Sequence, residues 1–411
     1  MNEELKVPEG WEWVNIENDV VVISGMRPKG GAIDDGVPSL GGEHITSDGR
    51  VIFSEDNAKF IPEKFYKLMK KGKVEKNDIL INKDGANTGK VAILREKFNP
   101  EIAINEHLFI VRSKSLFEQG FLFYWFFSSF GTRQLKEKIT GSAQPGLTSN
   151  FIKNFFVLCP PLPEQQKIAE ILETVDNAIE KTDAIIEKYK RIKQGLMQDL
   201  LTKGIDENWQ IGDEKTHKFK DSPLGRIPEE WEVVRLGEVF DIFAGGDIDM
   251  ENFSEDKTLK HKYPVYSNSL EKNGLYGYSS KYKFNENCIT VTGRGTLGYA
   301  VPRYEKFNAI IRLLVLQPKE QLNIKFVAEY INNKIKISTE NTGVPQLTVP
   351  HISGYSISLP PLPEQQRIAA VLSQIDEAIE KEQAYKEKLE RIKKGLMEDL
   401  LTGRVRVNCL L

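Results

Sequence analysis

PPLPEQQ at residues 160–166 and GLMQDLLT at residues 195–202 begin and end a stretch that the chain repeats 200 positions later. The second copy runs from PPLPEQQ at 360–366 to GLMEDLLT at 395–402. Aligned without a gap, 28 of the 43 positions are identical. Chance does not produce that agreement, so the chain is a tandem duplication in which each half ends in this segment.

Each copy has the pattern of one long helix. Pro163 and Pro363 stand where the first turn of a helix tolerates proline, and Gly204 and Gly403 follow the last apolar residue, where a glycine cap belongs. Between these limits apolar residues recur at spacings of four and three, the heptad pattern of a coiled coil. They are Ile168, Leu172, Val175, Ile179, Ile186, Tyr189, Leu196 and Leu200 in the first copy and Ile368, Leu372, Ile375, Ile379, Leu389, Leu396 and Leu400 in the second. Roughly 40 residues at about 1.5 Å each predict a helix on the order of 60 Å long.

The two helices are expected to pair with each other. A lone amphipathic helix would leave its apolar stripe in water, and each copy supplies the other with a partner. Only about 25 residues (203–227) connect the first helix to the next folded segment. Parallel helices would crowd both intervening domains at one end, so we expect an antiparallel coiled coil. Polar residues make the seam imperfect, at Thr182 and Lys193 in one copy and at Glu382, Lys386 and Lys393 in the other.

The duplication defines the domains. The openings VPEGWEWV at 7–14 and IPEEWEVV at 227–234 match, and Trp11 and Trp231 in them are expected to anchor the cores. We therefore expect domains at 1–159 and 227–359, helices at 160–203 and 360–403, a linker at 204–226 with a turn at 222–225, and a tail at 404–411.

Both domains show the same order of local patterns. A buried strand, a glycine turn, two further strands, an aromatic-rich helix and a polar turn with a glutamine follow one another. They are expected at residues 78–81, 84–90, 91–94, 105–111, 119–130 and 140–148 in the first domain, and at 288–292, 293–298, 299–302, 308–316, 325–333 and 342–348 in the second. Strands and helices mix without βαβ alternation, which predicts an α+β fold with two pseudo-repeated domains separated by the long helices.

Composition points to an ordinary globular protein. Of the 411 residues, 40% are hydrophobic and 28% charged. The three cysteines have no paired spacing, which favours reduced thiols and a cytoplasmic location. The acidic start does not resemble a signal peptide, and the most hydrophobic run, residues 121–130, is too short to span a membrane. The five histidines lack metal-ligand spacing, so no metal site is expected.

Three motifs that suggest catalysis or cofactor binding fail on inspection. GANTGKV at 85–91 has one residue too few for a phosphate-binding loop and is followed by an expected strand instead of a helix. The glycine pair at 245–246 lacks a βαβ context, and the flanks of the two Pro-Pro pairs cannot hold an amino group or a base. No catalytic triad or carboxylate pair recurs in both halves, so we expect no catalytic residue and no cofactor of the chain's own.

Each half contains one lysine-rich stretch. Residues 59–76 carry seven lysines against two glutamates, and residues 257–283 carry six lysines against one glutamate. A charge run is usually a solvated face. One such stretch in each repeat favours phosphate contact, although the whole chain has a net charge of −3.

Together these features resemble the specificity subunit of type I restriction–modification enzymes. The resemblance rests on the Pro-Leu-Pro-Glu-Gln-Gln helices ending in Gly-Leu-Met-x-Asp-Leu-Leu-Thr, the Pro-x-x-Trp openings, the SPLGRIP lead-in at 222–228 and the closing GRVRV at 403–407. It covers nearly the whole chain and is weakest inside the variable domains. It implies two target recognition domains, each reading half of an asymmetric, interrupted site in double-stranded DNA.

The same resemblance implies partners. The helices would fix the gap between the half-sites and dock two methyltransferase subunits, which carry S-adenosylmethionine and methylate adenine N6. Motor/nuclease subunits that use ATP and magnesium would complete the restriction complex. Matching residues that lie off the helix seam would be the docking candidates: Gln165, Gln166, Arg191 and Asp199, with Gln365, Gln366, Arg391 and Asp399.

Base readout requires side chains with paired donors and acceptors, carried on loops. The candidates are Lys83, Asp84, Asn87, Thr88 and Lys90 in the first glycine loop, Arg294 and Thr296 in the second, and Gln144 and Gln346 in the late turns. Phosphate contacts are expected from Lys67, Lys70, Lys71 and Lys73 and from Lys281 and Lys283. The loop glycines Gly85, Gly89, Gly293 and Gly298 are expected to serve turn geometry.

Two other classes of function stay open on the sequence alone. One is a stand-alone DNA-modifying enzyme, a nuclease or methyltransferase with an unrecognised site. The other is a coiled-coil scaffold that does not bind DNA, whereas a DNA reader binds in a strongly salt-dependent manner.

Overall fold

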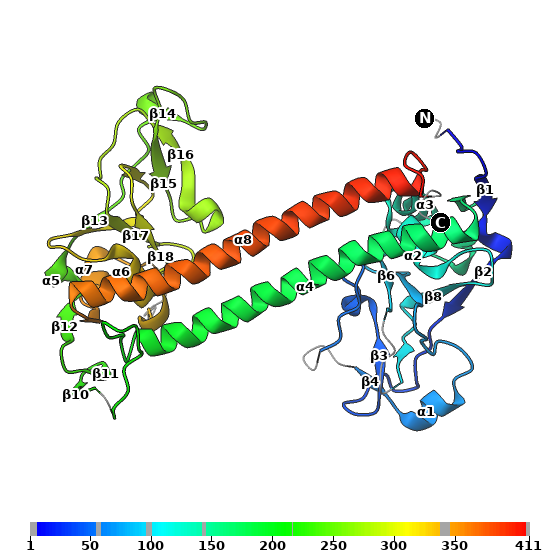
Figure 1. The fold of residues 1–411 in the computed structure, drawn as a ribbon, viewed down its shortest axis with the longest axis horizontal. Coiled ribbons are helices and arrows are strands. Elements are labelled where there is room, and N and C mark those ends of the chain that lie inside the picture. Colours follow the sequence, from blue (N-terminus) through cyan, green and yellow to red (C-terminus); the bar gives the residue numbers. More distant parts are fainter. Residues whose placement is uncertain are drawn as a thin grey trace. The chain divides into compact units, whose positions relative to one another are not determined.

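The computed structural model describes residues 6–54, 59–95, 101–141, 145–215, 217–337 and 346–407. The chain forms two compact units (Figure 1). Unit 1 comprises Met1–Asp183 with Ala384–Leu411, and unit 2 comprises Ala184–Gln383. Each unit therefore holds one domain with half of each long helix.

A four-stranded antiparallel sheet forms the centre of each domain. In unit 1 its strand order is β2 (Val20–Ser24), β8 (Leu108–Ser113), β5 (Ile79–Asn82) and β6 (Val91–Ile93). In unit 2 the order is β13 (Phe240–Ala244), β20 (Leu314–Pro318), β17 (Cys288–Val291) and β18 (Ala300–Arg303). Corresponding strands occupy the same place in both sheets, although their sequences differ.

A smaller sheet repeats as well. It contains β4 (Phe60–Ile61), β3 (Val37–Leu40) and β7 (Ala103–Ile104) in unit 1. Its counterpart contains β14 (Phe253–Ser254), β16 (Leu275–Ser279), β15 (Tyr263–Tyr266) and β19 (Asn308–Ala309). In each, one pair is parallel: β3 with β7, and β15 with β19. The α+β prediction and the duplicated topology are confirmed.

Each domain is closed by a strand pair next to its helix. β1 (Glu12–Asn15) pairs with β9 (Phe156–Cys159), and β12 (Glu232–Arg235) pairs with β21 (Ser356–Leu359). The predicted anchors are confirmed, since Trp11 and Trp231 are buried.

Short helices cover the sheets and correct one expectation. The predicted helix at 119–130 is two helices, α2 (Gln119–Phe127) and α3 (Ser129–Lys138). Ser128 separates them, because its hydroxyl accepts the backbone N–H of Gly131 at 3.2 Å and caps the second helix. The remaining short helices are α1 (Glu63–Leu68), α5 (Leu236–Val239), α6 (Ile324–Lys334) and α7 (Val349–Ser353).

The linker at 204–226 contains regular structure that the sequence did not reveal. β10 (Phe219–Ser222) and β11 (Gly225–Pro228) form a hairpin around the expected turn. Each strand has a single aromatic or branched aliphatic residue, Phe219 or Ile227, so neither carries an alternating apolar pattern that would predict it.

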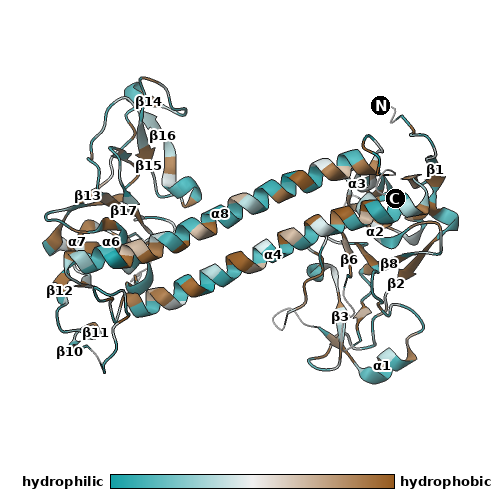
Figure 2. Ribbon diagram, viewed as in Figure 1, coloured by the Kyte–Doolittle hydropathy of each residue, from teal (hydrophilic) through white to brown (hydrophobic). Residues whose placement is uncertain are grey.

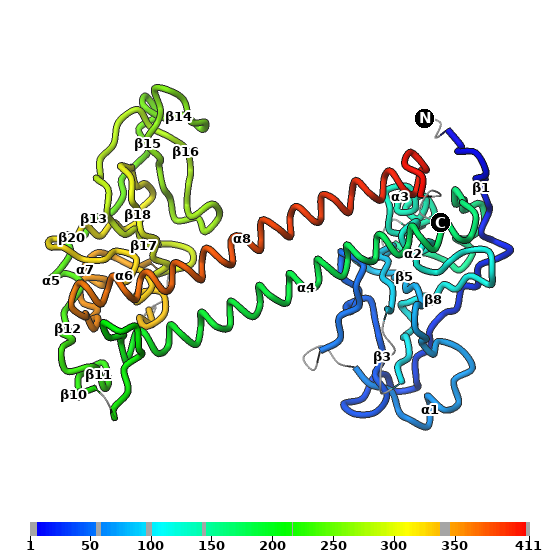
Figure 3. Tube along the Cα trace, in the orientation of Figure 1, coloured from blue at the N-terminus to red at the C-terminus, as the bar shows by residue number. Residues whose placement is uncertain are grey.

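The long helices are α4 (Leu162–Leu200) and α8 (Leu362–Leu401). Hydrophilic and hydrophobic residues, teal and brown in Figure 2, alternate along both helices. In unit 1 the beginning of α4 packs against the end of α8, with Ile168 and Leu172 in one core with Leu400 and Leu401. Unit 2 reverses the roles, with Leu200 and Leu201 of α4 packing in one core with Ile368 and Leu372 of α8. The helices therefore run antiparallel, as predicted (Figure 3). None of the helices in the described ranges is long and apolar enough to cross a membrane.

Three polar interruptions of the seam form ion pairs between the helices. Lys386 Nζ lies 2.6 Å from Asp183 Oδ1 in unit 1, and one further pair is present in both units. Lys393 Nζ lies 2.6 Å from Asp176 Oδ1, and Lys193 Nζ lies 2.7 Å from Asp376 Oδ1. These last two pairs occupy equivalent places in the two units, so residues that weaken the heptad pattern fix which helix turns meet.

Candidate nucleic-acid interface

Four loops meet at one end of the central sheet in each unit. Strand register brings them there: Ser24 and Leu108 stand beside Phe109 and Asn82 in unit 1, and Ala244 and Val291 both pair with Leu314 in unit 2. We call this end the loop edge. It comprises residues 25–27, 83–90, 105–107 and 145–149 in unit 1, and residues 245–247, 292–298, 310–313 and 346–349 in unit 2.

In unit 1 the predicted glycine loop and the predicted late turn lie together. The backbone N–H of Leu147 donates to the Lys83 carbonyl at 2.6 Å, and Asp84 and Gly146 form a β-bridge. The Thr88 hydroxyl donates to the Pro145 carbonyl at 3.2 Å. An open cavity of about 510 Å³ lies between these loops. Gln144 lies outside the described residues.

The turn before β8 adds groups that the sequence analysis missed. His107 Nδ1 lies 2.6 Å from Asp84 Oδ1, and Glu106 pairs with Arg27 at 3.0 Å. The Lys83 N–H also donates to the His107 carbonyl at 2.9 Å. The predicted strand at 105–111 hid this turn, because β7 ends at Ile104 and β8 begins at Leu108.

Three of the four lysines predicted to contact phosphate in unit 1 lie near this edge. A Cβ on Gly72 would stand 3.1 Å from the Cα of Gly25, which places the 70–73 segment beside the loop that follows β2. Lys70 and Lys71 are exposed there, and the Lys73 ammonium lies 4.5 Å from the Tyr66 ring centre. Lys67 is exposed on α1 and pairs with Glu63 at 3.5 Å.

Two further residues of the first glycine loop are half-buried. The Asn87 side chain donates to the Gly42 carbonyl at 3.4 Å, and the Lys90 carbonyl accepts the backbone N–H of Asn82 at 2.9 Å. Gly85 and Gly89 have φ of 78° and 84°, so their predicted role in turn geometry is confirmed. β6 follows the loop directly, as the sequence predicted, where a phosphate-binding loop would be followed by a helix.

Unit 2 brings the corresponding loops together. The Leu347 N–H donates to the Gly293 carbonyl at 3.0 Å, which places Gln346 beside the second glycine loop. Arg294 and Thr296 are exposed on that loop. Thr292 holds the loop closed, since its hydroxyl donates to the Thr296 carbonyl and accepts the Tyr299 N–H at 2.9 Å.

The two lysines predicted to contact phosphate in unit 2 lie near its loop edge, next to β19. Lys281 and Lys283 are exposed, and the Lys281 carbonyl accepts the side chain of Asn308 at 2.6 Å. Asn308 begins β19, which leads into the loop edge at Ile310. Ile311 and Arg312 form a turn there, so the predicted strand at 308–316 is wrong at its centre. Apart from Asn308 and Arg312 the run is apolar, and no change of period marks the break.

Two of the eight expected docking residues are not available to a partner. Gln165 and Gln365 are 1% and 2% exposed. Gln165 accepts the Glu118 N–H at 2.8 Å, and Gln365 accepts the Asn323 N–H at 2.9 Å. Each fastens the start of its helix to its own domain, which explains why both copies retain glutamine there.

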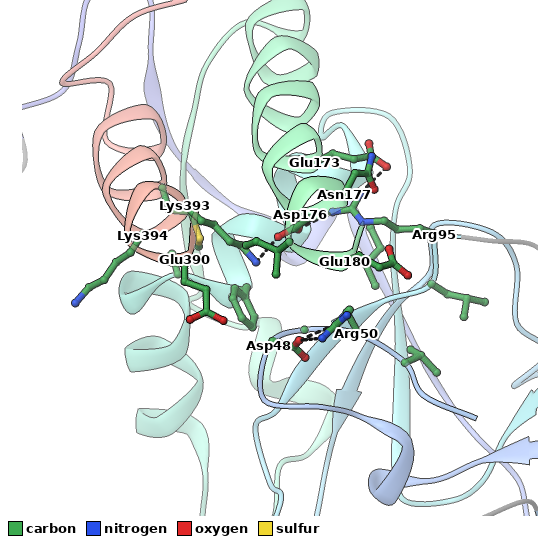
Figure 4. Close-up of a pocket in the computed structure, with 18 of the residues that line it drawn as sticks. Asp48, Arg50, Arg95, Glu173, Asp176, Asn177, Glu180, Glu390, Lys393 and Lys394 are labelled. Carbon is green, nitrogen blue, oxygen red and sulfur yellow. Dashed lines mark hydrogen bonds and ion pairs between the residues drawn. The ribbon is translucent and has the colours of Figure 1, made fainter. Parts of the chain in front are cut away.

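The other docking candidates lie at or near the surface of the helices. Gln166, Gln366, Arg191 and Arg391 are exposed, and Asp199 and Asp399 are half-buried. In unit 1 a separate cavity of about 710 Å³ is lined by residues 173–180 of α4 and 390–398 of α8 (Figure 4). Charged groups line it, among them Asp176, which lies between Arg95 and Lys393.

Comparison with known proteins places these features in a family. The family model for the type I restriction modification DNA specificity domain matches residues 8–190 and 228–391. The MjaVIII specificity subunit of Methanocaldococcus jannaschii is 29% identical, with 99% of this chain and 95% of that protein aligned. The putative MjaX specificity subunit of the same organism is also 29% identical, over 98% of this chain and 95% of that protein.

A solved structure supports the fold. The crystal structure of the S subunit of a type I restriction–modification system from M. genitalium matches with a TM-score of 0.66 at 15% identity, covering 97% of this chain and 99% of that one. The two family matches coincide with the two domains and their helices. The chain therefore belongs to the type I restriction–modification DNA specificity family, as a non-catalytic sequence-specificity subunit with two recognition domains.

Proposed function

We propose that each domain reads one half of an asymmetric, interrupted DNA site through its loop edge. One observation carries this proposal: both units build the same four-loop edge on the same sheet, but with different side chains. A shared frame with different loop chemistry is what two readers of two different half-sites require.

The side chains suggest different base preferences. The unit 1 edge presents Asp84, a carboxylate that can accept from cytosine N4, and Asn87, which can pair with adenine. The unit 2 edge presents Arg294, which suits the O6 and N7 acceptors of guanine. We therefore expect guanine in the half-site read by unit 2.

Phosphate contacts position such a reader without choosing the sequence. Lys70, Lys71 and Lys73 beside the unit 1 edge, and Lys281 and Lys283 near the unit 2 edge, are the proposed contacts. Lys67, Lys83, Lys90, Thr88, Thr296 and Gln346 complete the proposed DNA-facing set.

The helices are proposed to set the gap and to dock the catalytic partners. Gln166 and Gln366, Arg191 and Arg391, and Asp199 and Asp399 recur in both copies without serving the helix seam. A methyltransferase subunit docking once on each copy would explain their agreement. S-adenosylmethionine would then be carried by two methyltransferase subunits, ATP and magnesium by motor/nuclease subunits, and the complex would act on double-stranded DNA in the cytoplasm.

Mapping of methylated adenines tests this function. Cells that express the chain with its methyltransferase partner should acquire adenine methylation at one interrupted motif, and cells without the chain should not. Purified chain should bind that motif, with affinity that falls steeply as salt rises. Methyl transfer or cleavage by the purified chain alone would instead support a stand-alone enzyme, and absence of DNA binding would support a scaffold.

A further inference from the structure

The turn before β20 has an unusual backbone. Ile311 and Arg312 have φ of 53° and 62°, in the left-handed region. A β-branched residue rarely adopts this conformation, which costs free energy and persists only where surrounding contacts enforce it. The Ile311 side chain is nevertheless 47% exposed, so burial of its apolar surface does not explain the residue.

Two glycines hold the turn. The Ile311 N–H donates to the Gly246 carbonyl at 2.9 Å, and the Arg312 N–H donates to the Gly245 carbonyl at 3.2 Å. A Cβ on Gly245 would lie 2.8 Å from the Ala309 carbonyl carbon, so a larger residue would push the two segments apart. The glycine pair thus serves the close approach that keeps the turn in place.

Asn268 connects this turn to the second glycine loop. Its Nδ2 donates to the Ile311 carbonyl at 2.5 Å, and its Oδ1 accepts the N–H groups of Gly293 and Arg294 at 2.8 and 3.3 Å. Two N–H donors face the Asn268 oxygen and a carbonyl acceptor faces its nitrogen. Only one orientation of the amide therefore satisfies all three hydrogen bonds. A single side chain therefore sets the spacing between two arginine-bearing segments.

The arginines on these segments are available to a ligand. Neither Arg294 nor Arg312 forms an ion pair with any carboxylate of the described ranges, and both residues are exposed. The unit 1 edge differs, because Arg27 pairs there with Glu106 at 3.0 Å. Unpaired guanidinium groups on a backbone fixed from two sides suit bidentate recognition of a base edge.

We propose that the Ile311–Arg312 turn is a second base-reading element of unit 2, and that Asn268 is the positioning residue that aligns it with Arg294. Arg312 contacts a guanine edge, and Ile311 supplies an apolar contact of the kind that a thymine methyl group accepts. This inference rests on the proposed function and deepens it, since it assigns to unit 2 specificity residues beyond the glycine loop.

Ile311→Gly separates reading from structure. Glycine favours positive φ, so this variant should unfold at the same temperature as the parent or a higher one. In the complex with the methyltransferase subunits, its methylation map should lose discrimination at one position of the unit 2 half-site. Arg312→Ala should do the same at a neighbouring position, lowering the preference for the parent base by about tenfold or more.

Asn268→Ala and Lys319→Ala complete the set. Asn268→Ala should blur the positions read by both arginines, while Lys319→Ala, which removes a lysine at the opposite end of β20, should leave the half-site unchanged. A parent complex that methylates no interrupted motif would overturn the proposed function. A parent that methylates one, with Ile311→Gly and Arg312→Ala complexes reading an unchanged half-site, would overturn this inference alone.

Discussion

Glu164 and Glu364 occupy the same place in the two helices but meet different partners. Each accepts the indole N–H of its domain's tryptophan, Trp11 at 3.0 Å and Trp231 at 3.1 Å. Glu164 also accepts two hydrogen bonds from the Arg406 guanidinium, whereas Glu364 accepts the backbone N–H of Ile205. Burial raises the pKa of both carboxyls. At Glu164 the bonds from Arg406 and Trp11 outweigh burial and leave its pKa lowered, while at Glu364 the pKa stays raised.

The two carboxyls should therefore respond oppositely to pH. A lowered pKa in the folded state stabilises unit 1 above the ordinary value of 4.5, and that contribution is lost as pH falls through the folded pKa. The raised pKa of Glu364 means that its ionised form destabilises unit 2 at neutral pH. This destabilisation disappears as the pH falls and the carboxyl is protonated. We expect Glu164→Gln to destabilise strongly at pH 7 and less at pH 4, and Glu364→Gln to have little effect or to stabilise at pH 7. Urea denaturation at both pH values measures this, and equal losses at pH 7 would contradict it.

Arg406 joins the C-terminal segment to unit 1 through the same carboxylate. Arg406→Ala removes two charge-assisted hydrogen bonds from a buried acceptor, so it should lower the free energy of unfolding by about 2–3 kcal/mol. Arg404→Ala is the matched control, since this exposed arginine has no ion pair among the described residues. Similar losses in both variants would show that Glu164 does not depend on Arg406.

The ion pairs between α4 and α8 are expected to contribute to the stability of the helix pair. Asp176 contacts Lys393 across the helix pair and also accepts the hydroxyl of Tyr124 at 2.7 Å. Asp176→Ala leaves the buried Lys393 and the half-buried Arg95 without this acceptor, so it should cost about 2–4 kcal/mol. Glu187→Ala removes an exposed pair with Lys190 on the same helix and should cost under about 1 kcal/mol. Thermal melts of both variants check the difference, and an equal small shift would mean that the seam pair is dispensable.

The sequence predicted the elements whose signal is periodic or repeated. The heptad spacing and the identity of the two copies predicted α4 and α8, and the short connection at residues 203–227 predicted their antiparallel pairing. These signals could not show that Lys193 and Lys393 form ion pairs with aspartates of the other helix. A lysine in a heptad repeat gives the same sequence pattern whether it is paired or solvated. The hairpin at Phe219–Pro228 was missed because each of its strands has only one aromatic or branched aliphatic residue.

Part of the loop edge could be predicted because some of its loops have a clear sequence signal and others have none. Glycine and polar residues mark the loops at 83–90 and 292–298, and these loops do lie beside the late turns. Ile311 and Arg312 lie in a mainly apolar run that gives no sign of a turn. Gly245, Gly246 and Asn268, which are distant in the sequence, impose their backbone conformation.

At the scale of the whole molecule, the duplication predicts that the gap and the half-sites vary independently. Inserting one heptad into both α4 and α8, at equivalent positions, keeps the apolar seam in phase. The methylation map of this variant should show both half-sites unchanged and a gap of different length. Changed half-sites with a constant gap would contradict the role of the helices as spacer, and insertion into one helix alone serves as the mismatched control.

The two loop edges are proposed to read two half-sites independently. The most direct measurement compares adenine-methylation maps of cells that express the parent, Asp84→Ala or Arg294→Ala together with the methyltransferase partner. We expect Asp84→Ala to relax one half-site only and Arg294→Ala to relax only the other. Variants that both alter the same half-site, or that both leave the parent motif intact, would contradict it.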